Sequence, residues 1–156
     1  MTRYLCDTSA LVATVCSWHE HHARTRAEIE RRERTGEELV LAAHSLAETY
    51  AVLTRLPAPN RLRSGDALAL LEANWRETRV VHLTAAETWR ALRRAQRRDV
   101  IGGQAYDMLI AACALKAGAS TIVTWNARHF AATAPEISVE TPSLLAPGAS
   151  ETPRRP

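Results

Sequence analysis

Four side chains with carboxylate or amide oxygens lie near the ends of apolar segments. They are Asp7, Glu48, Asp107 and Asn126. Asp7 directly ends the apolar segment 4–6, and an acid in that position needs a partner or a function because burial of an unpaired charge is costly. If the segments are parallel strands, their carboxyl ends share one edge of a sheet, and polar side chains there lie together.

Three carboxylates on one edge would repel each other strongly unless a cation lay among them. Ligation by oxygen alone favours Mg²⁺, with Mn²⁺ as a substitute, over zinc. We therefore expect Asp7, Glu48 and Asp107 to be the metal ligands. A metal held in this way lowers the pKa of bound water and stabilises the charge on a phosphodiester under attack, so the pattern predicts metal-assisted phosphodiester hydrolysis.

Each of these residues also has a structural interpretation. We expect Glu48 in the first turn of a helix over 46–56, where it completes the capping-box pattern that begins at Ser45. Asp107 is favoured near a helix start by the helix dipole, and Asn126 could cap the segment toward Phe130. Four coincidental helix caps are therefore the alternative to a metal site.

Short apolar strands alternate with helices along the chain. The predicted strands cover residues 4–6, 39–43, 80–83, 121–124 and 137–139. The predicted helices cover 9–15, 23–34, 46–56, 64–75, 84–98 and 106–116. The mixed charges of the second helix indicate a solvated helix, whereas the last is apolar almost all round and should be buried. This order predicts an α/β fold, a three-layer α/β/α domain with a mostly parallel central sheet of four to five strands.

The length of 156 residues suits one domain, which we expect over residues 1–146. Residues 147–156 are rich in Pro, Gly, Ser and Arg, and we expect a disordered tail there. The sequence contains no apolar run long enough to cross a bilayer and no signal-peptide pattern at its start, which predicts a cytoplasmic protein with no membrane partner.

Two compositional features complete this picture. Cys6, Cys16 and Cys113 have no CxxC spacing and lie among apolar residues, which indicates buried, reduced thiols. The net charge of +3 weakly favours an anionic partner.

Five arginines follow the spacing of a single helical face. They are Arg90, Arg93, Arg94, Arg97 and Arg98. We expect Trp89 and Leu92 on or near the opposite side of this helix, toward the core. The arginine face could bind RNA phosphates or an acidic partner, and the alternative is an ordinary solvated face.

Several aromatic residues lie near the predicted site in the sequence. His19, His21 and His22 lack the spacing of a zinc-protease helix, and we expect them in a loop at the rim of the site. Trp125 is a predicted core residue, although its place beside the site would also let it stack a base. We expect His129 to serve packing.

Five segments resemble, in order, the motifs of PIN domains. They are LCDTSALV (5–12), SLAETYAVLTRL (45–56), YDMLIAACA (106–114), TWNARHF (124–130) and VETPSLL (139–145). Together they extend over almost the whole chain. The subgroup that they most resemble is the VapC toxins of toxin–antitoxin pairs.

This resemblance implies a Mg²⁺-dependent endoribonuclease that forms a homodimer. It also implies a VapB-like antitoxin that neutralises the enzyme in a heterotetramer or larger assembly. Asp7, Glu48 and Asp107 match the metal-binding acids of the family, while Thr8 and Thr124 match small hydroxyl residues near the site.

Asn126 stands where many relatives have Asp, and this departure argues against a second metal rather than against catalysis. The same departure supports an alternative function, a catalytically degenerate PIN domain that binds RNA or a partner. A phosphatase with Asp7 as the nucleophile would need a second acid two residues later, where Ser9 stands.

Overall fold

A five-stranded parallel sheet forms the centre of the computed structural model, which describes residues 1–142. The strands are β1 (Arg3–Cys6), β2 (Glu38–Ala42), β3 (Arg79–Val81), β4 (Thr121–Val123) and β5 (Ser138–Glu140). Their order is β3-β2-β1-β4-β5, and every neighbouring pair is parallel. The predicted α/β class is confirmed, whereas the predicted tail 147–156 lies outside the described residues.

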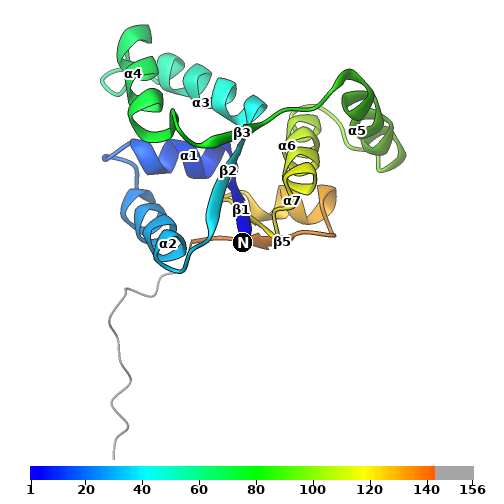
Figure 1. Cartoon of the computed structure of the whole chain (residues 1–156). Helices are drawn as coiled ribbons and strands as arrows, with labels where there is room; N and C mark the ends of the chain where they lie inside the picture. The colour runs from blue at the N-terminus through cyan, green and yellow to red at the C-terminus, as the bar shows by residue number, and fades with distance from the viewer. Residues whose placement is uncertain (143–156) are drawn as a thin grey trace, which may run out of the picture.

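Helices cover both faces of this sheet (Figure 1). They are α1 (Thr8–Val15), α2 (His22–Arg34), α3 (Ala43–Arg55), α4 (Ser64–Trp75), α5 (Ala85–Arg97), α6 (Gln104–Ala117) and α7 (Ala127–Thr133). The first four pack on one face, α6 and α7 pack on the other, and α5 lies outside α6. The sequence analysis assigned no helix to α7.

The three inner strands β2, β1 and β4 are largely apolar because both of their faces are buried, whereas the edge strands β3 and β5 are more exposed. In β1, Tyr4 and Cys6 belong to the core cluster beneath α1 to α4, while Leu5 between them belongs to the cluster beneath α6 and α7. The same alternation places Leu41 on the first face and Val40 on the second. The predicted three-layer arrangement is therefore confirmed.

The start of α3 differs from its prediction. The helix begins at Ala43, directly after β2, and its N-cap residue Ala42 provides no side-chain hydrogen bond. Ser45 is consequently inside the helix and fully buried, and Glu48 lies in the second turn. The capping-box interpretation of Glu48 is wrong, because β2 leads into the helix without the connecting residues that a cap would need.

Helix α5 packs in a way that its sequence pattern did not predict. Thr84 and Glu87 form the predicted capping box. However, Trp89 is 60% exposed and Leu92 is 40% exposed, so their predicted position toward the core is wrong. Helix α5 instead contacts α6 through the small side chains of Ala91 and Ala95, because small residues allow two helices to approach closely.

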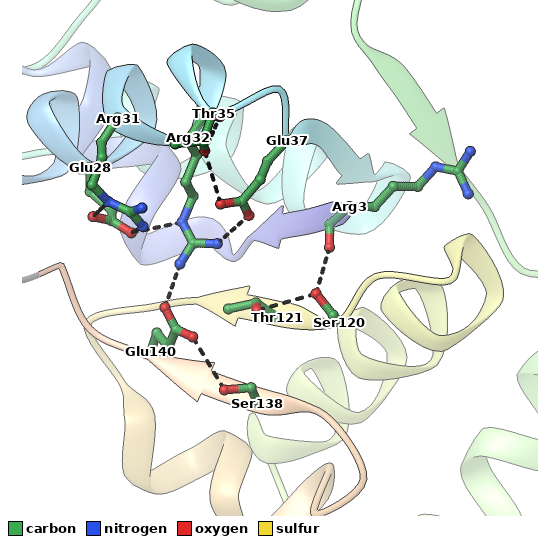
Figure 2. Close-up of polar contacts among 10 residues, drawn as sticks. All are labelled: Arg3, Glu28, Arg31, Arg32, Thr35, Glu37, Ser120, Thr121, Ser138 and Glu140. Carbon is green, nitrogen blue, oxygen red and sulfur yellow. Dashed lines mark hydrogen bonds and ion pairs between the residues drawn. The ribbon is translucent and has the colours of Figure 1, made fainter. Parts of the chain in front are cut away.

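The charged helix α2 is held by a buried arginine rather than fully solvated as predicted. Arg32 is 3% exposed. Its guanidinium donates to Glu28 over 2.7 Å and to Glu37 over 2.8 Å, and it also donates to Glu140 of β5 (Figure 2). The guanidinium carbon lies 5.0 Å from the centre of the Tyr4 ring. One side chain therefore ties α2 to both β1 and β5.

Two further expectations can be compared with the structure. Cys6, Cys16 and Cys113 are buried and unpaired, as predicted. None of the helices within residues 1–142 combines the length and the apolar character required to cross a membrane.

We predict that Arg32→Met lowers the free energy of unfolding by about 1–3 kcal/mol, because the partly buried carboxylates of Glu28 and Glu37 lose a hydrogen-bonded cation. Urea unfolding followed by circular dichroism would measure the change. Arg26→Met is the matched control, since Arg26 pairs with Glu30 on the exposed side of the same helix, and we expect a change within about 0.5 kcal/mol. Equal stability of the two variants would contradict the role of Arg32.

Candidate active site

A cavity of about 450 Å³ contains all four residues that the sequence analysis placed together. Asp7 follows β1, Glu48 comes from α3, Asp107 from α6, and Asn126 lies between β4 and α7. Strands β1 and β4 are neighbours in the sheet although more than a hundred residues separate them in sequence. The convergence follows from this pairing, because the two strands deliver their next residues to the same edge.

Asp7 is the most buried acid of the cavity, with 3% of its surface exposed. Its Oδ1 accepts hydrogen bonds from the Ala10 amide (3.0 Å) and the Ser9 hydroxyl (2.7 Å), and its Oδ2 accepts one from Thr124 (2.8 Å). Asp7 is therefore also the N-cap of α1. A carboxylate has about four acceptor positions, so these bonds leave one on Oδ2 for another ligand.

Burial raises the pKa of Asp7 to about 6. The hydrogen bonds from Ala10, Ser9 and Thr124 oppose this shift, and the charge of Asp107 adds to it. The carboxylate thus stays difficult to ionise even with three donors. A cation near Oδ2 would reverse this penalty.

Thr124 is fully buried and fixes the geometry around Asp7. Its hydroxyl donates a hydrogen bond to Asp7 and accepts one from the backbone N–H of Asn126 over 2.9 Å. Ser9 has a parallel role, since its hydroxyl donates to Asp7 and accepts from the Trp125 amide over 2.9 Å. The sequence analysis did not single out Ser9 as a site residue, because a serine early in a helix carries no distinctive signal.

Glu48 faces α1 rather than the backbone of its own helix. Its Oε2 accepts a hydrogen bond from Thr8 over 2.7 Å, and the His44 ring nitrogen lies 3.7 Å away. The carboxylate is thus oriented by a side chain from the turn that follows Asp7. This hydrogen bond places Thr8, one of the two hydroxyl residues that match the family motifs, at the site.

Asp107 occupies the first turn of α6, as predicted. Burial raises its pKa, the nearby His129 opposes this shift, and the Glu48 carboxylate adds to it. His129 Nδ1 lies 3.3 Å from Asp107 Oδ2, and the His129 side chain is about half exposed. The expectation that His129 serves packing is therefore wrong, because the ring lies over the acid.

Asn126 stands at the N-cap position of α7, but its side chain makes no capping hydrogen bond. The side chain lines the cavity instead. His19 and His21 line the same cavity from the loop between α1 and α2, as predicted, whereas the prediction is wrong for His22, which begins α2 and is not among the lining residues. Trp125 lines it as well and is only half-buried, so it is not a core residue.

The carboxylates of the cavity have no arginine or lysine among the residues that line it, whereas the acids around Arg32 share a guanidinium. The residues that line the cavity include two histidines but neither arginine nor lysine. Within residues 1–142, the acids around Arg32 are thus neutralised by a buried guanidinium, whereas those of the cavity are not.

The donor set fits a magnesium ion. Within residues 1–142, no three His, Cys, Asp or Glu side chains lie close enough together to hold one metal ion. The acids instead interact in pairs, Asp7 with Asp107 and Asp107 with Glu48. Mg²⁺ is commonly held by one or two carboxylates and keeps several waters. Paired carboxylates with an amide nearby therefore suit Mg²⁺ or Mn²⁺.

The arginine face lies away from this cavity. A separate groove of about 460 Å³ between α5 and α6 is lined by Lys116 and four of the five predicted arginines, Arg90, Arg93, Arg94 and Arg97. The fifth, Arg98, is the C-cap residue of α5 and is not among the lining residues. Arg94 also forms an ion pair with Glu136, which partly neutralises its positive charge. The structure therefore does not bring the arginines into the acidic site.

Comparison with known proteins identifies the fold and the family. Residues 4–135 match the PIN domain family. Ribonuclease VapC40 of Mycobacterium tuberculosis is 36% identical over 116 residues, which cover 74% of this chain and 81% of the relative.

Two solved structures share the fold at low sequence identity. The Mycobacterium tuberculosis sarcin-ricin loop cleaving toxin VapC20 has a TM-score of 0.65 and 21% identity, with 86% of this chain and 98% of that chain covered. VapBC2 from Rickettsia felis, bound to a DNA fragment from its promoter, has a TM-score of 0.67 and 17% identity, with 90% and 98% covered. The chain belongs to the PIN domain family and is homologous to the VapC ribonuclease toxins.

Proposed function

We propose that this protein is a Mg²⁺-dependent endoribonuclease toxin that hydrolyses RNA phosphodiester bonds. The observation that carries the proposal is the meeting of Asp7, Glu48 and Asp107 in one cavity, where two of the three carboxylates have raised pKa values and none has an arginine or lysine partner among the lining residues. The similarity to ribonuclease VapC40 supports RNA as the substrate.

Of the proposed ligands Asp7, Glu48 and Asp107, the pairs Asp7 with Asp107 and Asp107 with Glu48 would hold the metal, with Mn²⁺ as a substitute for Mg²⁺. The bound cation supplies a Lewis acid and a water of lowered pKa. Thr124 and Ser9 keep the Asp7 carboxylate in one orientation, so its free acceptor position on Oδ2 stays directed by the scaffold. The Asn126 side chain is the nearby neutral group that can donate a hydrogen bond to a phosphate oxygen or a water without adding negative charge.

We further infer that a VapB-like antitoxin neutralises the protein in the cytoplasm. The structural similarity to chains of VapBC and FitAB complexes supports this partner. Its assembly would be a homodimer of this chain, joined by antitoxin into a heterotetramer or larger particle.

A binding-only PIN domain remains the alternative, and Asn126 together with the pairwise spacing of the acids is the observation that favours it. A domain of that kind need not take up metal. Calorimetric titration with Mg²⁺ would therefore separate the two functions.

We predict that Asp7→Asn lowers the rate of RNA cleavage at least about 100-fold, because the loss of metal binding removes several kcal/mol of transition-state stabilisation. Cleavage of total cellular RNA with Mg²⁺, followed by mapping of the ends, would measure it, and EDTA should stop the wild type. Asp66→Asn, an exposed acid of α4, is the matched control and should keep full activity. Full activity of Asp7→Asn would overturn the proposed function.

Asp7 should also make the metal-free protein less stable as the pH rises. The pKa of Asp7 is about 6 in the folded state and about 3.9 when unfolded, so the folded state binds the proton more tightly. Its contribution to the free energy of unfolding is complete below about pH 4, and about 2–3 kcal/mol is lost as the pH rises past 6.

Urea unfolding in EDTA between pH 4 and 8 would test this, with the difference between wild type and Asp7→Asn isolating the residue. We expect the variant to be the more stable protein at pH 8 without metal, and Mg²⁺ to stabilise only the wild type. A parallel pH dependence in the two proteins would contradict the shifted pKa.

The arginine face of α5 is our proposed contact with the RNA backbone. The double variant Arg90→Gln/Arg97→Gln should weaken RNA binding and reduce the slope of log affinity against log salt by about one to two. Arg26→Gln/Arg76→Gln removes the same charge from two exposed arginines, one in α2 and one directly after α4, and serves as the control. An identical change in both double variants would show that the face is only solvated.

A further inference from the structure

The groove of about 460 Å³ between α5 and α6 combines basic and apolar side chains. Its basic residues are Arg90, Arg93, Arg94, Arg97 and Lys116, and its apolar residues are Leu83, Ala91, Ala112 and Leu115. Glu87 also lines it and forms an ion pair with Lys116. We call it the arginine groove. Pockets that hold small molecules have volumes of about 300–1,000 Å³, so one ligand could meet both kinds of side chain.

Three arginines of the groove keep their positive charge available to a ligand. Arg94 forms an ion pair with Glu136. Within residues 1–142, no carboxylate forms an ion pair with Arg90, Arg93 or Arg97, and all three side chains are exposed. These three positions extend over about 10 Å of the helix. A ligand that neutralises them must therefore carry several negative charges within a short distance, as linked phosphate groups do, and guanidinium groups bind phosphate in a bidentate manner.

The apolar part of the groove is partly open to solvent. Leu115 is 41% exposed. Ala91 and Ala112 contribute only one methyl group each, which leaves room beside α6. An inorganic anion would leave this apolar surface uncovered, whereas a planar base could cover it and also stack on a guanidinium plane. The ligand that matches the whole lining therefore carries both phosphates and a flat ring.

The arginine groove and the acidic cavity use different faces of α6. Asp107 and Ile110 line the cavity, whereas Ala112 and Lys116 line the groove. At about 3.6 residues per turn, the second pair points at least about 120° away from the first around the helix axis. A ligand in the groove therefore leaves the carboxylates of the cavity free. RNA held in the cavity would have to pass around α6 to enter the groove, whereas a small ligand enters it directly from solution.

We propose that the arginine groove is a binding site for a nucleoside polyphosphate. The phosphates lie on Arg90, Arg93 and Arg97, and the base lies against Leu115 and the neighbouring alanines. The same arginines are our proposed contact with the RNA backbone, so a bound nucleotide competes with RNA for α5. This competition rests on the proposed function, whereas nucleotide binding itself does not.

Calorimetric titration with ATP tests the site, in EDTA so that no metal ion joins the phosphates to the acids of the cavity. We expect Arg90→Gln/Arg93→Gln to weaken ATP binding at least about tenfold, because charge-assisted hydrogen bonds to the phosphates are lost. Arg26→Gln/Arg76→Gln removes the same charge elsewhere and should bind ATP like the wild type. Equal weakening in both double variants, or a wild type that does not bind ATP, would overturn the proposal.

Two comparisons test the place of the nucleoside. Inorganic triphosphate should bind at least about fivefold more weakly than ATP, because it has no ring to cover the apolar residues. Leu115→Glu places an acid in the groove and should abolish ATP binding, whereas Leu68→Glu makes the same change at a leucine of α4 that is 52% exposed and should leave binding intact. Equal affinities for ATP and triphosphate would contradict a nucleotide site, as would unchanged binding by Leu115→Glu.

Asp7→Asn shows whether the groove is independent of the acidic cavity. Since Asp7 lines the cavity and not the groove, this variant should bind ATP as tightly as the wild type. A loss of affinity in Asp7→Asn would place the nucleotide in the cavity and overturn the proposal.

RNA binding in EDTA, followed by fluorescence anisotropy, separates this inference from the proposed function. ATP should weaken RNA binding by the wild type but not by Arg90→Gln/Arg93→Gln. ATP binding without this competition would overturn the RNA contact of the arginine face alone. RNA binding that depends on the arginines, in a protein that does not bind ATP, would overturn the nucleotide site alone.

Discussion

The buried carboxylate of Asp7 is the constraint on which the geometry of the cavity depends. It lies where β1 meets β4, and it caps α1 while accepting hydrogen bonds from side chains of both connections. Burial still raises its pKa to about 6, so the folded protein keeps an acid in a place that disfavours its charge. The free-energy cost of burying this charge is tolerated because the surrounding sheet and helices hold Asp7 in place, and a bound cation would offset that cost.

The fold treats two groups of acids in opposite ways. Around Arg32, three glutamates share one buried guanidinium, and the result ties α2 to the sheet (Figure 2). Around Asp7, the lining residues supply hydroxyls and histidines but no arginine or lysine. In the first group, the chain itself supplies the neutralising cation, and the group stabilises the fold. The second has negative charge in excess, which suits a site whose remaining partner comes from solution.

The lining of the cavity comes from several elements. Asp7 follows β1, Glu48 and Asp107 come from α3 and α6, and the rings of His19 and His21 come from the α1–α2 loop. The arginine groove between α5 and α6 is a separate surface, because α5 packs outside α6 and not on the sheet. The acids of the cavity, its histidine rings and the arginines of the groove are thus carried by different elements of the fold.

The sequence by itself determined the order of the strands and of every helix except α7, the parallel sheet and the identity of the acids near its edge, because apolar runs and helical spacing are local properties. It could not determine which side chains meet across the chain. Ser9 and Thr124 both bind Asp7 but lie more than a hundred residues apart, His129 covers Asp107, and Glu48 accepts from Thr8. The exposure of Trp89 and the burial of Arg32 likewise depend on which neighbour each helix finds. Such contacts depend on how whole helices and strands pack together, and local sequence patterns do not predict that packing.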